Sequence, residues 1–156
     1  MISCRGIEAN SDQISALLNL EQPKDARQVQ HLTRMIPALG WFISRLVDKC
    51  LPFFQLLGKK MKFLWDEDFL AAFQGIKAYL SSPPCLSIPC PGEPLFLYLA
   101  VSKHAVSAVL VREMNEGQKP VFFVSKIMNE AESKYLPLKK AALALIQATK
   151  KLPHYF

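Results

Sequence analysis

Several features that signal catalysis or membrane insertion are missing from this 156-residue sequence. No apolar run approaches the roughly 18 residues that a membrane span needs, so we expect no membrane partner. The six glycines form no Gly-x-Gly pair, which excludes a phosphate-binding loop, and no Gly-x-Ser-x-Gly elbow marks a serine hydrolase. Polar and acidic side chains interrupt the first residues, unlike a secretory signal, so we expect an intracellular protein that is not secreted.

Metal-binding and redox motifs are equally sparse. No Cys-x-x-Cys pair and no histidine at zinc-finger spacing accompany the four cysteines, Cys4, Cys50, Cys85 and Cys90. This pattern favours free thiols over a zinc site or a disulfide. Surface or structural roles are expected for the three scattered histidines, His31, His104 and His154.

Carboxylates are scarce where hydrolysis would need them. The acid cluster Asp66-Glu67-Asp68 stands at a predicted helix start, where it complements the helix dipole and Asp66 serves as the cap. No acid follows Glu132. A two-metal hydrolytic site needs several carboxylates converging on Mg²⁺, so we expect no catalytic residue, metal or cofactor, and no small-molecule ligand.

The composition is that of a folded chain with a mild basic bias. Hydrophobic residues make up 51% of it, enough to bury a core. Nineteen basic residues against thirteen acidic ones give a net charge of +6. This balance favours anionic partners without reaching the charge density of a histone.

Apolar spacing predicts helices throughout the first half. A short helix begins at Asn10 or Ser11 and ends before Pro23, and a longer one starts near Asp25. One face of the longer helix carries Val29, Leu32, Ile36, Leu39, Ile43 and Leu46. Since Pro37 lies inside that pattern, a kink or break is expected there. A third helix is expected over Leu51–Leu57, ending at Gly58, and a fourth after Asp66 buries Phe69, Phe73, Ile76 and Leu80.

In the second half of the chain, the spacing of apolar residues changes from the helical pattern to one typical of strands. Three short apolar runs predict strands at Leu95–Val101, Ala105–Val111 and Val121–Val124, covered on both faces. The connections are short enough to be hairpin turns, which makes the three an antiparallel meander. After Pro137, a last helix is expected to bury Leu138, Ala142, Leu145, Thr149 and Leu152. The fold class is therefore α+β, with a helical segment at 1–82, a proline-rich ordered linker at 83–94 and a sheet with one packing helix at 95–156.

The order of several short motifs resembles the polyprotein of gypsy-class LTR retrotransposons, from the end of the reverse transcriptase into the RNase H-like domain. The resemblance covers nearly the whole chain, and the amino-acid sequence of Leu97–Ser102 looks most like that of the plant elements of this class. The motifs that carry it are Arg5–Asn10, Val29–Thr33, Phe42–Arg45, Lys49–Phe54, Phe63–Trp65, Ala72-Phe73, Ile76-Lys77, Leu80–Pro84 and Pro120–Lys126.

This resemblance implies a helical thumb and connection segment followed by a truncated RNase H-like domain that ends before the fourth strand. Active relatives bind Mg²⁺ through an Asp where this chain has Ala100 and a Glu where it has Ala141; Lys139 stands at another commonly acidic position. Both expected acidic positions are therefore occupied by alanine. The resemblance thus implies an RNase H-like shape without its chemistry, and no catalytic residue is assigned.

Three functional hypotheses follow. The first is a catalytically inactive scaffold that joins the remainder of the reverse transcriptase polyprotein and binds an RNA–DNA duplex weakly through its phosphates. Such contacts would involve Lys24, Arg27, Arg34, Arg45, Lys59, Lys60 and Lys62. The second is a degenerate genomic remnant without activity, whose incomplete sheet leaves an apolar edge open to pairing. The third, an active hybrid ribonuclease or RNA-directed DNA polymerase, is disfavoured because the carboxylates are missing.

Overall fold

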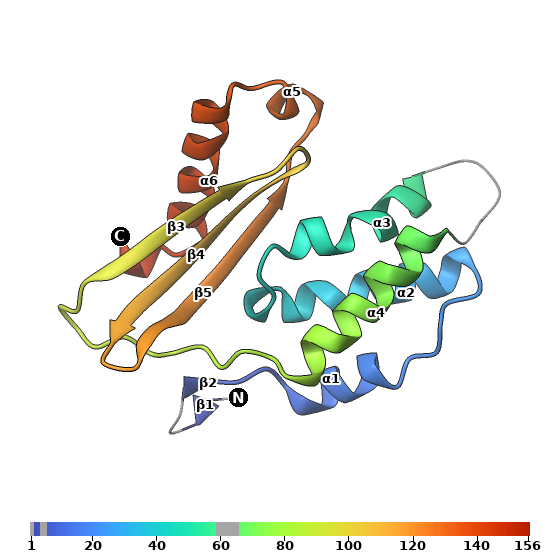
Figure 1. Ribbon diagram of the computed structural model, residues 1–156, viewed down its shortest axis with the longest axis horizontal. Coiled ribbons are helices and arrows are strands. Elements are labelled where there is room, and N and C mark those ends of the chain that lie inside the picture. Colours follow the sequence, from blue (N-terminus) through green and yellow to red (C-terminus); the bar gives the residue numbers. More distant parts are fainter. Residues whose placement is uncertain (1, 4–5, 59–65) are drawn as a thin grey trace.

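The computed structural model describes residues 2–3, 6–58 and 66–156, and it confirms the α+β class, with helices first and then a three-stranded antiparallel sheet with a packing helix (Figure 1). In chain order its elements are β1 (Ile2–Ser3), β2 (Gly6–Ile7), α1 (Ser11–Leu18), α2 (Ala26–Met35), the 3₁₀ helix η1 (Ile36–Phe42), α3 (Leu46–Gly58), α4 (Glu67–Ser81), β3 (Leu95–Val101), β4 (Ala105–Met114), β5 (Gly117–Ile127), α5 (Glu130–Ser133), α6 (Pro137–Lys151) and the 3₁₀ helix η2 (Pro153–Tyr155).

Three helices begin where the sequence predicts a cap. The side chain of Asn10 accepts a hydrogen bond from the Asp12 amide at 2.9 Å, and that of Asp25 accepts from the Gln28 amide at 2.8 Å. Asp66 does the same for the Phe69 amide at 2.8 Å. Each bond satisfies a backbone donor that the first helical turn leaves unpaired.

The long amphipathic helix predicted from Asp25 is interrupted, as expected, at Pro37. α2 ends at Met35 and continues as η1, with the proline in its first turn, where a missing N–H costs least. The prediction that the next helix starts at Leu51 is wrong, because α3 begins at Leu46. Arg45, with a backbone φ of 50°, turns the chain there, and α3 then accommodates Pro52 inside it.

The helices share one hydrophobic core. The predicted face of α4 is buried, and the ring of Phe69 packs edge-on against Phe53 of α3 with centroids 5.0 Å apart. Phe123, from β5, packs against the same core. A side chain of the sheet therefore packs into the core of the helices.

The sheet is the predicted meander, in the order β3-β4-β5, with both pairs antiparallel. β4 and β5 are longer than expected, because the hairpin between them tightens to a short turn in which Gly117 adopts a φ of 112°. An irregularity between Leu110 and Val111 shifts the register opposite Pro120. A proline lacks the N–H that a regular ladder requires, which accounts for a shift at this position.

Coverage of the sheet is uneven. α6 lies on one face, and η1 and α3 approach β5 from the other side (Figure 1). β4 is buried along most of its length, in agreement with the expectation of two covered faces. For β3 that expectation is wrong, because Phe96, Tyr98, Leu99 and Val101 are each at least 38% exposed at the edge of the sheet.

The predicted buried face of α6 is wrong in part, although Leu152 is buried as expected. Leu138 and Leu145 are 82% and 42% exposed, whereas Ala144 and Ala148 are buried, together with Leu152 just after the helix. Small side chains let the helix backbone approach the sheet closely, so the alanines rather than the leucines face it.

The proline-rich segment 83–94 is held at three points. Leu86 exchanges backbone hydrogen bonds of 2.8 and 2.9 Å with Ile7 of β2, and the Ser87 amide donates to the Pro120 carbonyl at 2.7 Å. Glu93 forms a 2.7 Å ion pair with Arg112 of β4, and both side chains are only 15% exposed. Gly6 makes the first contact possible, since a Cβ there would lie 2.2 Å from the Leu86 carbonyl oxygen.

No helix in the described part of the chain is both long and apolar enough to cross a membrane. Three of the four cysteines fall among the described residues, and none forms a disulfide: Cys50 is buried, and Cys85 and Cys90 are exposed. Burial raises the pKa of the Cys50 thiol to about 12, with the neighbouring Lys49 acting in the opposite direction.

Candidate nucleic-acid interface

The four predicted basic residues that the structure describes lie in two different places. Lys24, Arg27 and Arg34 are exposed along the α2 region, whereas Arg45 precedes α3 beside the sheet. Lys59, Lys60 and Lys62 lie outside the described residues.

The basic residues of the α2 region line separate hollows. Lys24 and His31 border a hollow of about 190 Å³, where Lys24 also reaches Glu21 at 4.0 Å. Arg34 borders another hollow beside Asp12. The two hollows share no lining residue, so Lys24 and Arg34 do not belong to one continuous cationic surface.

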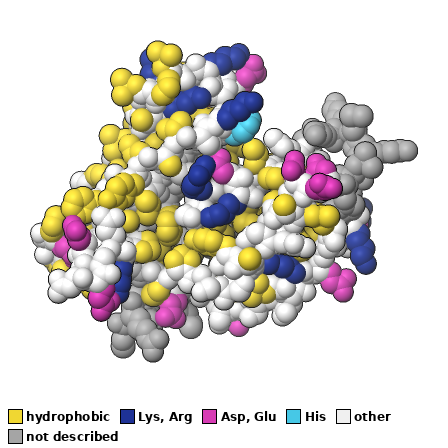
Figure 2. All heavy atoms as spheres, in the orientation of Figure 1, with side chains coloured by type: hydrophobic (Ala, Val, Ile, Leu, Met, Phe, Trp, Pro, Cys, Tyr) yellow, Lys and Arg dark blue, Asp and Glu magenta, His cyan; other side chains and the backbone are white. Residues whose placement is uncertain are grey.

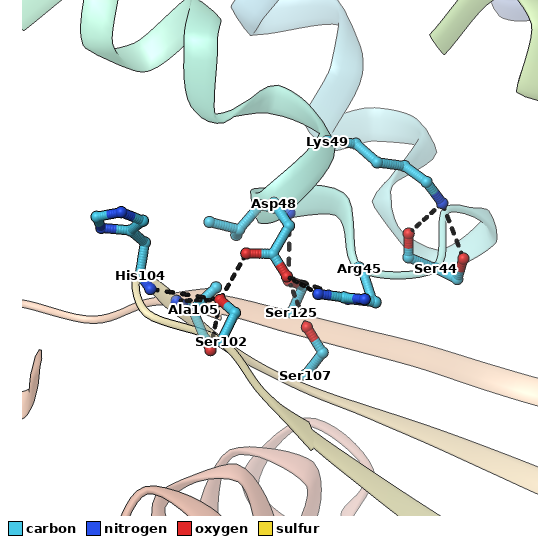
Figure 3. Close-up of polar contacts among 10 residues, drawn as sticks. Ser44, Arg45, Asp48, Lys49, Ser102, His104, Ala105, Ser107 and Ser125 are labelled. Atoms are coloured by element: carbon cyan, nitrogen blue, oxygen red, sulfur yellow. Dashed lines mark hydrogen bonds and ion pairs between the residues drawn. The ribbon is translucent and has the colours of Figure 1, made fainter. Parts of the chain in front are cut away.

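Arg45 instead belongs to a polar cluster between the helices and the sheet. Its Nε and Nη2 groups donate to Asp48 Oδ2 at 3.2 and 3.1 Å. The other carboxylate oxygen, Asp48 Oδ1, accepts from the Ser102 hydroxyl at 2.6 Å (Figure 3). Asp48 thus joins the first turn of α3 to the turn between β3 and β4. We call the set Ser44, Arg45, Asp48, Lys49, Ser102, Ser107 and Ser125 the junction cluster.

Ser102 also organises the turn that it belongs to. Its Oγ accepts from the amides of His104 and Ala105 at 3.3 and 3.0 Å. Because a hydroxyl has one proton, donation to the charged Asp48 leaves the Oγ lone pairs for these amides. The same serine therefore holds the turn and the helix together.

Two further serines complete the contact on the strands. The Ser107 and Ser125 hydroxyls lie 3.1 Å apart on neighbouring strands, and Ser125 Oγ accepts from the Val47 amide at 3.2 Å. Val47 lies in the first turn of α3, where the backbone has no helical acceptor. The sheet thus provides an acceptor for one backbone amide of the helix terminus.

Lys49 forms the other side of the junction cluster. Its Nζ donates to the Ser44 carbonyl at 2.6 Å and to Ser44 Oγ at 2.9 Å, and it lies 4.1 Å from the centre of the Tyr79 ring. Burial, together with the nearby charge of Arg45, lowers the pKa of Lys49. Figure 2 shows Lys and Arg side chains in the depression between the sheet and the helices.

A hollow of about 210 Å³ opens beside Arg45 on the sheet. Tyr98, Ala100, Ser107 and Phe123 line it, with Arg45 on the helical side. Ala100 pairs with Ser107, so it lies on the face of the sheet that is turned toward α3.

Ala141 is half-buried on α6, across the sheet from that hollow. Mg²⁺ prefers carboxylate and other oxygen ligands, which neither alanine provides. Across residues 2–3, 6–58 and 66–156, no three His, Cys, Asp or Glu side chains lie close enough to hold a metal. The residues at the two family positions therefore do not fit a magnesium site.

No local pattern in the sequence indicates the junction cluster. Its members come from α3, the β3–β4 turn and two strands, and Asp48 and Ser102 are 54 positions apart. Of the cluster, sequence reasoning identified Arg45 alone. Asp48 precedes the helix that the sequence predicts from Leu51, whereas in the structure it lies in the first turn of α3.

Comparisons with known proteins agree with this architecture. The family model described as "RNase H-like domain found in reverse transcriptase" matches residues 65–156. The chain is 24% identical over 166 residues to the "Retrovirus-related Pol polyprotein from transposon opus" of Drosophila melanogaster, and 28% identical over 155 residues to the "Transposon Tf2-3 polyprotein" of Schizosaccharomyces pombe. Each match covers 99% of this chain but only 17% and 12% of the relative.

Among solved structures, the foamy viral protease–reverse transcriptase in complex with an RNA/DNA hybrid aligns with a TM-score of 0.78 at 19% identity. That match covers 97% of this chain and 21% of the viral one. A second structure of the viral enzyme, in complex with double-stranded DNA, gives the same TM-score at 19% identity. At this level of identity, the likeness establishes the fold.

The helices, the meander and the packing helix together therefore have the fold of the matched part of the viral reverse transcriptase. The chain belongs to the family of RNase H-like domains found in reverse transcriptases. It spans between about an eighth and a sixth of the length of the curated relatives cited above.

Proposed function

We propose that this chain is a non-catalytic module that holds a nucleic-acid duplex, an RNA–DNA hybrid in particular, in the depression between α3 and the sheet. The observation that carries the proposal is the junction cluster, in which Asp48 bonds to Ser102 and to Arg45 at once. These bonds tie the start of α3 to the turn between β3 and β4 and hold Arg45, whose side chain is 59% exposed, at the boundary of helices and sheet.

The charge of the chain supports phosphate-directed contacts. The formal net charge is +6, and Arg45 and Lys49 stand together at the boundary. The relatives of known structure include a reverse transcriptase in complex with an RNA/DNA hybrid. Contacts to phosphates carry no sequence information and weaken as the salt concentration rises.

The absence of hydrolysis is part of the proposal. In active family members, Mg²⁺ would activate water and stabilise the leaving oxygen. Ala100 and Ala141 offer no oxygen to such an ion, so we expect the duplex to be bound without being cut. Mg²⁺-dependent cleavage that is abolished by EDTA would contradict this part of the proposal.

Fluorescence anisotropy with a labelled RNA–DNA hybrid tests binding, at salt concentrations from about 50 to about 200 mM. Arg45→Ala should weaken binding several-fold and lower the salt slope by about 1. Arg27→Ala removes the same charge from α2 and is the matched control. Equal losses in the two variants would argue against a duplex at the junction cluster, as would no binding by the unaltered chain at low salt.

The finer assignments belong to the same proposal. These are the gypsy class, the plant-type wording of Leu97–Ser102, and the division into a thumb and connection segment at 1–82, a linker at 83–94 and an RNase H-like domain at 95–156. The partners proposed are the remainder of a reverse transcriptase polyprotein and the duplex.

The exposed side chains of β3 and α6 favour one alternative, a degenerate remnant without activity. Val101 is 40% exposed at the sheet edge and Leu138 is 82% exposed, and an apolar edge of this kind promotes pairing with other chains. Circular dichroism separates the two readings, because a working module should melt in one cooperative transition. A broad, non-cooperative loss of signal would favour the remnant.

A further inference from the structure

A narrow slot separates η1 from the outer edge of β5, next to the junction cluster. It measures about 240 Å³, and its lining includes Trp41 and Gly40 of η1, Phe122 and Ser125 of β5, and Lys151 at the end of α6. Ser125 also belongs to the junction cluster. The slot therefore adjoins the depression in which the proposed duplex would lie.

Trp41 gives the slot an aromatic wall. Its indole packs on the Phe122 ring with centroids 5.1 Å apart and an interplanar angle of 42°, yet the residue remains 61% exposed. An indole that is held by a neighbouring ring and still open to solvent offers a flat surface on which a planar ligand can stack.

Lys151 gives the slot its charge. It ends α6, its side chain is exposed, and it forms no ion pair among the described residues. No carboxylate is among the described residues that line the slot. A positive group without a nearby acid is complementary to a phosphate.

The edge of β5 adds polar backbone groups. The Met128 amide donates to the His104 carbonyl at 2.9 Å, so the backbone at this position points toward β4. In an antiparallel pair the backbone N–H and C=O groups of every second residue point toward the partner strand, so those of Lys126 and Val124 also point toward β4. Those of Phe123 and Ser125 consequently turn away from β4, toward the slot. Backbone donors and acceptors beside an aromatic surface can pair with the edge of a nucleobase whatever its identity.

We propose that this slot binds one unpaired nucleotide of a nucleic-acid strand, with the base stacked on Trp41 and its phosphate on Lys151. The inference rests on the proposed function, since it places a single-stranded end beside the bound duplex. Lys151 and the exposed indole of Trp41 favour a nucleotide over an extended peptide, which would use the strand edge alone.

The test compares a blunt-ended RNA–DNA hybrid with the same hybrid carrying a short single-stranded overhang, by fluorescence anisotropy. The unaltered chain should bind the overhang form at least about 5-fold more tightly, the lower end expected for one stacked base. Trp41→Ala and Lys151→Ala should each reduce that preference and leave binding of the blunt hybrid unchanged. Tyr155→Ala and Lys139→Ala remove an exposed aromatic ring and an exposed lysine elsewhere and should preserve the preference.

An overhang that lacks its bases separates stacking from charge. It should lose most of the preference, and its residual binding should depend on Lys151 but not on Trp41. A preference that persists in Trp41→Ala, or an equal loss for blunt and overhang hybrids in a Trp41→Ala variant with an unchanged melt, would overturn the proposal.

Trp41 fluorescence tests the slot even if the chain does not bind a duplex. With Trp65→Phe, Trp41 is the only tryptophan of the chain, since the sequence has two. A single-stranded oligonucleotide should quench its fluorescence even if no hybrid binds at Arg45. An unchanged Trp41 signal at every oligonucleotide concentration would overturn the slot proposal, whatever happens to the duplex.

Discussion

Ser102 and Asp48 are 54 positions apart in the sequence, and the hydroxyl of the first donates to the carboxylate of the second at 2.6 Å. This bond links the turn between β3 and β4 to the first turn of α3 (Figure 3). Arg45 donates to the other oxygen of the same carboxylate. Asp48 therefore ties the start of α3 to the sheet through one side chain that has partners on both sides.

Ser102→Ala should lower the free energy of unfolding by about 1–2 kcal/mol, because it leaves Asp48 and two turn amides without their partner. Urea denaturation measures the change. Ser81→Ala is the control, since that hydroxyl is exposed and bonds only to carbonyls of its own helix, and it should cost less than about 0.5 kcal/mol. Equal costs for the two serines would contradict the role given to Ser102.

Cys50 should make stability fall at alkaline pH. Burial raises the pKa of its thiol from 9.0 to about 12, so between these values the folded chain keeps a proton that the unfolded chain releases. The free energy of unfolding then decreases as pH rises, by about 1 kcal/mol at pH 10. Cys50→Ala should remove this decrease between about pH 8 and about pH 10 in urea denaturation. The idea fails if both proteins show the same pH dependence.

Glu93 should fasten the linker in a pH-dependent way. The Cys90 amide and the Arg112 guanidinium hold the pKa of Glu93 below its ordinary value. The stabilisation that ionised Glu93 gives to the linker is therefore present above pH 4.5 and is lost as pH falls through the lowered pKa. Glu93→Gln should speed amide hydrogen exchange in 83–94 at neutral pH. Glu116→Gln, in an exposed pair with Lys119, should not. Unchanged exchange in Glu93→Gln would refute the role of this ion pair.

Replacements on α6 should reveal which face packs on the sheet. Ala148 is fully buried, so Ala148→Leu should overpack the contact and lower stability by about 1–3 kcal/mol. Leu138 is 82% exposed, so Leu138→Ala should change stability by less than about 0.5 kcal/mol. Thermal unfolding of the two variants gives the comparison, and the reverse ranking would restore the leucine face as the buried one.

Local signals in the sequence predicted much of the fold. Asn10, Asp25 and Asp66 cap helices because a short polar side chain satisfies a backbone amide within three residues of itself. Pro37 interrupts a helix because its ring removes a donor, whatever surrounds it. Features of this kind depend on neighbours in the chain and are visible without a structure.

The errors arose where distant packing decides the outcome. The apolar spacing of α6 allowed two faces, and the small size of Ala144 and Ala148 selected the one that approaches the sheet most closely. The junction cluster was missed for the same reason, since no local pattern pairs Asp48 with Ser102. Of the residues that were predicted to bind phosphates and that the structure describes, Arg45 is the one that belongs to the junction cluster.

The tight contact between Gly6 and Leu86 has a consequence for the whole molecule. A methyl group at position 6 would collide with a backbone oxygen, and the φ of +131° would already strain any larger residue. Gly6→Ala would therefore separate the segment around Gly6 from the segment around Leu86, which lies about eighty positions later in the chain. The segment that contains Leu86 leads into β3, the first strand of the meander. A substitution near the N-terminus would therefore weaken the attachment of the sheet to the rest of the chain.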